Sequence, residues 1–202
     1  MNKKIIVAIC GASGSIYGIR LLKALLSKPV NIYLIISNAG YKVLEHETGY
    51  SGEELTSFLK DKGVVIHKDA GLNIYEQDDL FAPPASGSFR HDGMVIAPCS
   101  MKTLAAIASG VADNLIHRSA DVSLKEKRPL ILLPRETPLS AIHIKNMYKL
   151  AMSGATIMPP SPSFYFNPKT ISDLVDTVIA RVLDHLKIEQ DLVGQWGDKT
   201  VV

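Results

Sequence analysis

The stretch IIVAICGASGS, residues 5–15, places a run of strand-forming residues directly before a loop of Gly, Ala and Ser. A helical pattern follows at once, because Ile16, Ile19, Leu22 and Leu26 recur at intervals of three or four residues. A strand, a turn of small residues and a helix present free backbone N–H groups and the positive end of a helix dipole to an anion. We therefore predict that this loop binds phosphate.

Two residue types in the loop suit that role. Gly11 and Gly14 allow a close approach of the backbone and a positive φ. Ser13 and Ser15 add hydroxyl donors. An ordinary strand-to-helix turn is the alternative interpretation, because short glycine loops are common.

Composition limits the classes of function. The 202 residues are 47% hydrophobic with a net charge of +2, which predicts a globular chain without the positive field of a nucleic-acid-binding protein. No apolar run reaches the roughly 18 residues of a membrane span, and we expect a cytoplasmic location. Cys10 and Cys99 follow predicted strands and are expected to be buried thiols. The six histidines lack metal-binding spacing, so no metal is predicted.

Apolar runs alternate with amphipathic segments along the chain. Strands are predicted at 5–10, 31–37, 64–67, 93–97, 130–133 and 155–158, with helices between them and a last helix capped by Thr170. This alternation predicts an α/β fold, a doubly wound parallel sheet covered by helices on both faces in three αβα layers. We expect one domain over residues 1–187. Residues 188–202 have no core pattern and are expected to form a tail that packs on a neighbouring subunit.

Ligands of such folds bind at the carboxyl ends of the strands, and several polar residues lie there. Ser37 stands where dinucleotide-binding proteins place an acidic residue, and the first loop is not G-x-G-x-x-G. Both departures favour a mononucleotide over NAD. A second turn with hydroxyls, Ser100 to Thr103, precedes another helix. The loop at 81–88 contains two prolines and is predicted to be a site loop, although a linker is the alternative.

Basic residues near the strand ends exceed what one phosphate requires. Arg118, Lys125, Arg135, Arg181 and the phenol of Tyr165 predict a second anion site, whereas solvated surface charge is the alternative for each one. The carboxylates of Glu47 and Glu136 could move protons in such a crevice, or could simply pair with the arginines.

Four segments carry a family resemblance. They are GASGSIYGIRLL at 11–22, APPASGSF at 82–89, the run from APCSMKT to LLPRETP at 97–138, and FYFNPKTISDLVDTVIARVLDHL at 164–186. Together they resemble the UbiX flavin prenyltransferases over nearly the whole chain. That family belongs to a flavodoxin-like superfamily of FMN-binding decarboxylases, which implies a flavodoxin-like, Rossmann-like fold.

The resemblance implies a metal-independent transferase that moves a dimethylallyl group from dimethylallyl phosphate to N5 and C6 of reduced FMN. The prenylated FMN would serve a UbiD-type decarboxylase, as in ubiquinone biosynthesis, and the chain would assemble as a dodecamer. Two alternatives stay open: an FMN-dependent decarboxylase of the same superfamily, and a non-enzymatic flavin carrier.

The resemblance also assigns roles by position, without a departure at the matched residues. The FMN-binding residues would be Gly11, Ala12, Ser13, Ser37, Ser100, Met101, Lys102, Thr103 and Arg135. The prenyl substrate would contact Ala85, Ser86, Gly87, Arg118, Lys125, Tyr165, Arg181 and Trp196. The catalytic residues would be Ser13, Glu47, Lys125 and Glu136.

Overall fold

The computed structural model describes residues 2–194, and in this part of the chain six parallel strands form one sheet in the order β3-β2-β1-β4-β5-β6. The strands are β1 (Lys3–Ile9), β2 (Val30–Ile36), β3 (Gly71–Glu76), β4 (Gly93–Cys99), β5 (Leu130–Pro134) and β6 (Thr156–Ile157). The α-helices are α1 (Ser15–Leu26), α2 (Asn38–Thr48), α3 (Leu55–Asp61), α4 (Met101–Ala108), α5 (Leu115–Lys125), α6 (Ala141–Met152) and α7 (Ile171–His185), with a short 3-10 helix η1 (Pro83–Ala85).

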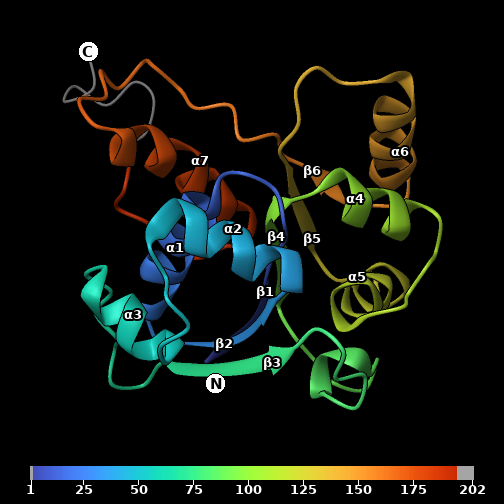
Figure 1. The fold of residues 1–202 in the computed structure, drawn as a ribbon, viewed down its shortest axis with the longest axis horizontal. Coiled ribbons are helices and arrows are strands. Elements are labelled where there is room, and N and C mark those ends of the chain that lie inside the picture. The colour runs from blue at the N-terminus through green and yellow to red at the C-terminus, as the bar shows by residue number, and fades with distance from the viewer. Residues whose placement is uncertain (1, 195–202) are drawn as a thin grey trace.

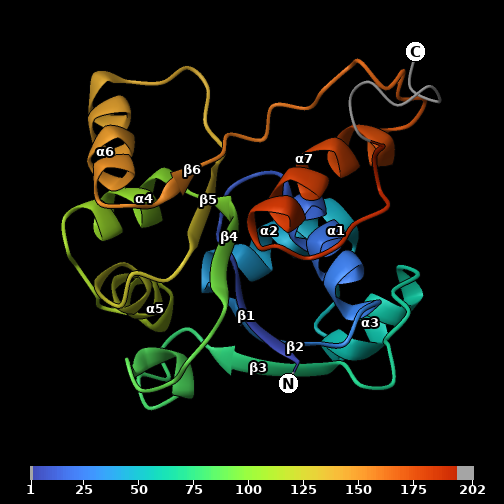
Figure 2. The same ribbon diagram turned by 180° about the vertical axis from the view of Figure 1, so that it is seen from behind.

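Helices cover both faces of the sheet, as Figures 1 and 2 show from opposite sides. One hydrophobic cluster joins the sheet to α1, α3 and α7, and a second joins it to α4, α5 and α6. Ile5 and Val7 of β1 belong to the first cluster, while Ile6 and Ala8 belong to the second, because neighbouring side chains of a strand point to opposite faces. The predicted doubly wound, three-layer fold is confirmed.

The prediction of a strand at 64–67 is wrong. The amide of Val64 donates to the Leu59 carbonyl at the end of α3, and the amide of His67 donates to Leu26 at the end of α1. These bonds use the backbone groups that a strand needs. The third strand is instead β3, which pairs with β2 at the sheet edge and is only half-buried, so it lacks the apolar run that marks the central strands.

The described start of the predicted tail contacts its own chain. Ile188 is buried in the first hydrophobic cluster and Leu192 packs against it. Trp196 lies outside the described residues, so the packing of the tail on another subunit stays a prediction. Among the helices of residues 2–194, none is long and apolar enough to cross a membrane.

Candidate active site

Four loops meet at the carboxyl edge of the sheet. They follow β1, β2, β4 and β5, and backbone hydrogen bonds connect them beyond the strand ends. The amide of Ser37 donates to the Ile9 carbonyl over 3.0 Å, and the amide of Cys10 donates to the Pro98 carbonyl over 3.1 Å. The amide of Arg135 donates to the Cys99 carbonyl over 3.2 Å. The structure therefore brings the predicted FMN-binding segments, which are far apart in the sequence, to one edge.

The N-terminus of α1 already holds an anion. The carboxylate of Glu47, on α2, accepts hydrogen bonds from the amides of Gly14, at 3.0 Å, and Ser15, at 2.7 Å. These two amides are therefore occupied by a carboxylate of the same chain, and phosphate binding by the loop stays a prediction. This contact could not be predicted from local sequence, because Glu47 lies 33 residues after Gly14 and reaches it only in the folded chain.

The same contact controls the charge of Glu47. Partial burial opposes ionisation, but hydrogen bonds from Ser13 and from the amides of Gly14 and Ser15 outweigh it and hold the pKa of the Glu47 carboxyl below its ordinary value. The group is thus a stable carboxylate at neutral pH. Its oxygen atoms lie beside Ser13, the other predicted catalytic residue of this loop.

The two loop glycines are needed for different reasons. Gly14 has a φ of 108°, which a side chain would strain. Gly11 is absent from the positive-φ residues, so the expectation of a positive φ there is wrong. A Cβ at Gly11 would lie 2.4 Å from the Ala39 Cβ, so its small size permits the close approach of α2.

Serine caps two other helices that begin at this edge, α2 and α4. Ser37 Oγ accepts from the amide of Gly40 at the start of α2, and Ser100 Oγ accepts from the amide of Thr103 at the start of α4. No carboxylate of the described residues hydrogen-bonds to the first turn of α4, in contrast to α1. A helix N-terminus without an acidic partner suits an anionic ligand.

Hydrogen bonds between hydroxyl groups connect the start of α4 to the buried end of β1. Ser100 Oγ donates to Thr103 Oγ1, which donates to Cys10 Sγ over 3.4 Å. Thr103 is buried, so its hydroxyl points into the protein and supports Ser100. Burial raises the pKa of Cys10 to about 11, which leaves an inert thiol acceptor. Met101 is half-buried and Lys102 is exposed on the same turn.

Arg135, directly after β5, supplies a polar group that lacks a protein partner. Its Nε is buried and has no hydrogen-bond partner among the described residues. Its side chain lies beside Gly14 and Tyr17. A buried guanidinium donor without an acceptor fits an oxygen or phosphate of a bound ligand. The neighbouring Glu136 is exposed and accepts a hydrogen bond from the amide of Thr137.

A second group of predicted residues lies on α5 and the loop beside it. Arg118 donates from Nε to the Ala85 carbonyl over 3.0 Å and pairs with Asp121. Ser86 is exposed and Gly87 half-buried on the same loop. Lys125 is exposed at the last residue of α5, five residues before β5 begins, and so lies toward the amino edge of the sheet.

A third group lies on α7 and the segment that crosses it. Arg181 is exposed, pairs with Asp184, and lines a cavity of about 680 Å³ together with Pro159, Ser161 and Phe166. Tyr165 is 70% exposed on the same segment. The loops after β1, β2, β4 and β5 contribute none of its lining residues, whereas Met158 and Pro159, directly after β6, do.

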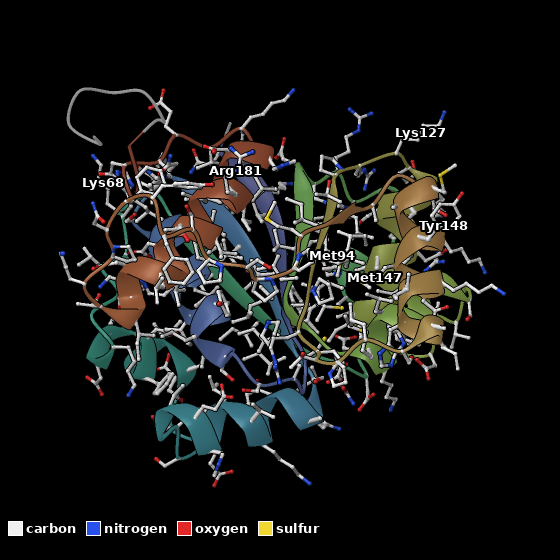
Figure 3. The ribbon with its side chains drawn as sticks, turned by 90° about the horizontal axis from the view of Figure 1, so that it is seen from above. Lys68, Met94, Lys127, Met147, Tyr148 and Arg181 are labelled. Carbon is white, nitrogen blue, oxygen red and sulfur yellow. The ribbon has the colours of Figure 1, made fainter. Side chains whose placement is uncertain are left out.

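One chain does not bring Lys125 and Arg181 together. Helices α5 and α7 pack on opposite faces of the sheet. Figure 3 shows Arg181 and Lys127, two residues beyond Lys125, on opposite sides of the strands. The expectation of a single crevice that contains all the basic residues is therefore wrong for the isolated chain. The described residues also contain no group of three or more potential metal-binding side chains.

Comparisons with known proteins agree along the whole chain. The family model described as Flavoprotein matches residues 1–183. A flavin prenyltransferase UbiX of Halalkalibacterium halodurans is 46% identical over 198 residues, which cover 96% of this chain and 93% of that protein.

Two crystal structures are also similar. AnUbiX (PadA1), in complex with FMN and dimethylallyl pyrophosphate, has 41% identity and a TM-score of 0.87, with 98% of each chain covered. A dodecameric FMN-dependent UbiX-like decarboxylase of Escherichia coli O157:H7 has 43% identity and a TM-score of 0.85, with 96% of this chain and 98% of that chain covered.

Proposed function

Because this chain belongs to the Flavoprotein family and, within it, to the UbiX-type flavin prenyltransferases, we propose that it transfers a dimethylallyl group from dimethylallyl phosphate to reduced FMN. New bonds would form at N5 and C6 of the flavin, and phosphate would leave. The observation that supports this most directly is the unpartnered, buried Nε of Arg135 at the edge where four loops meet.

FMN would bind at this edge. The first turn of α4 and the Arg135 guanidinium offer donors to its oxygens, and Gly11, Ala12 and Ser37 lie in the neighbouring loops after β1 and β2. Glu47 keeps the N-terminus of α1 occupied, so the phosphate of FMN is expected at α4 rather than at α1.

The prenyl phosphate would bind where copies of the chain meet. Lys125 and Arg181 are exposed on helices that cover opposite faces of the sheet, and Tyr165 is exposed on the segment beside α7. Lys125 and the other two residues therefore surround one anion only if different subunits supply them. The dodecameric relative supports an assembly of this kind. Arg118, already held by Asp121, would support the group from α5.

The chemistry then depends on charge and position. Cleavage of an allylic C–O bond leaves positive charge on carbon and negative charge on phosphate, which lysine and arginine side chains stabilise. Glu136, exposed beside Arg135, would pass a proton to the departing phosphate. Ser13 and the Glu47 carboxylate would take part in proton removal at the flavin. Holding both substrates in contact supplies much of the remaining rate.

Mass spectrometry of the reaction mixture tests the activity. Protein, reduced FMN and dimethylallyl phosphate should yield an adduct one C5 unit heavier than FMN. Unmodified flavin alone would reject the transferase and leave a flavin carrier, while loss of CO₂ from an added peptide or acid substrate would favour the decarboxylase alternative. Dimethylallyl diphosphate in a parallel reaction identifies the donor.

Subunit complementation tests the shared site. Lys125→Ala and Arg181→Ala should each be nearly inactive as pure proteins. When they are denatured and refolded together at equal amounts, about a quarter of the sites should receive both wild-type residues and regain activity. Separately refolded proteins, mixed afterwards, are the control. No recovery in the co-refolded sample would place both residues of a site in one chain.

Two further predictions rest on the family relationship alone. The product would be passed to a UbiD-type decarboxylase, and the protein would act in the cytoplasm. When this protein is co-expressed with such a decarboxylase in cells that otherwise lack a flavin prenyltransferase, the activity of the decarboxylase should increase.

A further inference from the structure

The loop from η1 to β4 is fixed by a residue that the sequence analysis did not single out. Arg128, in the turn after α5, donates from Nη1 to the Phe89 carbonyl over 2.6 Å and from Nη2 to the Gly87 carbonyl over 2.7 Å. Its side chain is only 14% exposed. A planar guanidinium that reaches two carbonyls at once restricts both the position and the direction of that backbone.

Other contacts fix the two ends of the same loop. Arg118 holds the Ala85 carbonyl at one end. At the other end, the ring of Phe89 packs edge-on against Tyr33, with 4.7 Å between the ring centroids. Residues 86–88 are therefore a short span between two anchored points. The hydroxyls of Ser86 and Ser88 are 2.8 Å apart across it.

The loop also lies close to the end of α5, where Gly87 stands beside the tip of a flexible side chain. A Cβ at Gly87 would stand 2.6 Å from Oε1 of Glu126, which lies at the end of α5. Figures 1 and 2 show the loop beside α5 in both views. The carbonyls of Ala85 and Gly87, which would otherwise need water, accept hydrogen bonds from arginines.

We propose that Arg128 is a positioning residue for the prenyl donor: its hydrogen bonds to the carbonyls of Gly87 and Phe89 hold the loop of residues 85–89 in the shape that receives the dimethylallyl group. The inference rests on the proposed function, because it takes this loop to line the prenyl site. Arg128 acts through the loop and does not touch the substrate. It therefore affects how well the donor binds, while FMN binds at the carboxyl edge of the sheet through other residues.

The test compares Arg128→Met, which removes the donors, with Arg128→Lys, which keeps the charge but replaces the planar guanidinium with donors on a single nitrogen. Arg90→Met is the matched control, because Arg90 is exposed at the end of the same loop. Steady-state kinetics with dimethylallyl phosphate, the Kd of FMN and hydrogen exchange of residues 86–89 are measured on the full chain. Circular dichroism selects variants that are folded.

For Arg128→Met we expect the KM for dimethylallyl phosphate to rise at least about tenfold, with kcat within about threefold and the FMN Kd within about twofold. Amide exchange at residues 86–89 should become faster. The KM and the exchange rates of Arg128→Lys should lie between those of Arg128→Met and wild type. Those of Arg90→Met should match wild type.

Three results would overturn the inference. They are an unchanged KM in Arg128→Met, equal losses of donor use and FMN affinity, and a Lys variant equal to wild type. If Arg128→Met does not fold, the Lys variant decides by the same measurements. A wild-type protein that makes no prenylated FMN would overturn the proposed function and this inference together, whereas an active wild type with an unaffected Met variant would overturn the inference alone.

Discussion

Two candidate binding regions, the carboxyl edge of the sheet and the basic residues of α5 and α7, differ in whether one chain brings their residues together. At the edge, four loops are connected by backbone hydrogen bonds, and Arg135 presents a buried donor without a partner. Lys125 and Arg181 are instead exposed on opposite faces. This difference is the basis of our proposal that one chain binds the flavin, while the prenyl phosphate needs residues from a second copy.

Within the edge itself, α1 and α4 show a similar contrast. Each follows a buried strand through a short loop with hydroxyls. At the start of α1 the amides donate to the Glu47 carboxylate, while α4 is capped by the Ser100 hydroxyl. The same local pattern therefore has two outcomes, and a residue from another helix decides between them.

The largest expected effect comes from Glu136→Gln, which tests whether the edge supplies chemistry as well as binding. FMN should stay bound, because Arg135 and α4 are unchanged, while turnover should fall by about 10²–10⁴ through the loss of proton transfer. Single-turnover assays and flavin titration measure the two quantities. Glu45→Gln, an exposed change on α2, is the control. Unchanged turnover would remove Glu136 from the mechanism.

Lys125→Ala separates the two regions most directly. Loss of one ammonium that faces phosphate should lower kcat/KM for the prenyl donor about 100-fold, with the FMN Kd within about twofold. Lys149→Ala, an exposed lysine of α6, is the matched control. If donor use and FMN affinity fall together, the division into two halves is wrong.

Ser100→Ala examines the edge alone. Removal of the cap should cost about 1 kcal/mol of stability and weaken FMN binding about tenfold, because α4 then presents its first turn less rigidly. Ser140→Ala removes an equivalent cap from α6 and should cost similar stability with no change in the FMN Kd. Equal FMN binding by both variants would contradict a role for α4. Thermal unfolding and fluorescence titration are the measurements.

The smallest effect is a pH dependence at α1. The pKa of Glu47 lies below its ordinary value of 4.5, so the unfolded chain takes up the proton first as the pH falls. The stability that Glu47 contributes is fully present above that ordinary value and is lost as the pH drops through the folded-state pKa. Because the side chain is exposed, the loss should stay under about 1 kcal/mol.

Denaturant unfolding of wild type and Glu47→Gln between about pH 6 and 3 measures this loss. The difference between the two proteins should be largest at pH 6 and shrink toward pH 3. A difference that does not change with pH would mean that the carboxylate is not held by the amides of Gly14 and Ser15.

The sequence was sufficient for the fold class and for the residues at the carboxyl edge. Apolar runs such as 5–10 mark central strands, because a strand covered on both faces must be apolar throughout. Parallel strands then bring Gly11, Ser37, Ser100 and Arg135 to one edge, whatever their separation in the chain. Helix starts followed from caps such as Thr170, a contact over three residues. These features depend on local patterns that a sequence displays.

Only the tertiary structure decided how those residues are used. Glu47 reaches Gly14 over 33 positions, Thr103 turns inward to Cys10, and Arg128 holds carbonyls about 40 residues away. The edge strand β3 and the separation of Lys125 from Arg181 were likewise hidden, because an edge strand needs few apolar residues and a charge on a helix does not reveal which face of the sheet that helix covers. Hydrogen-bond partners and faces are properties of packing, and packing between distant segments leaves no periodic signal in the chain.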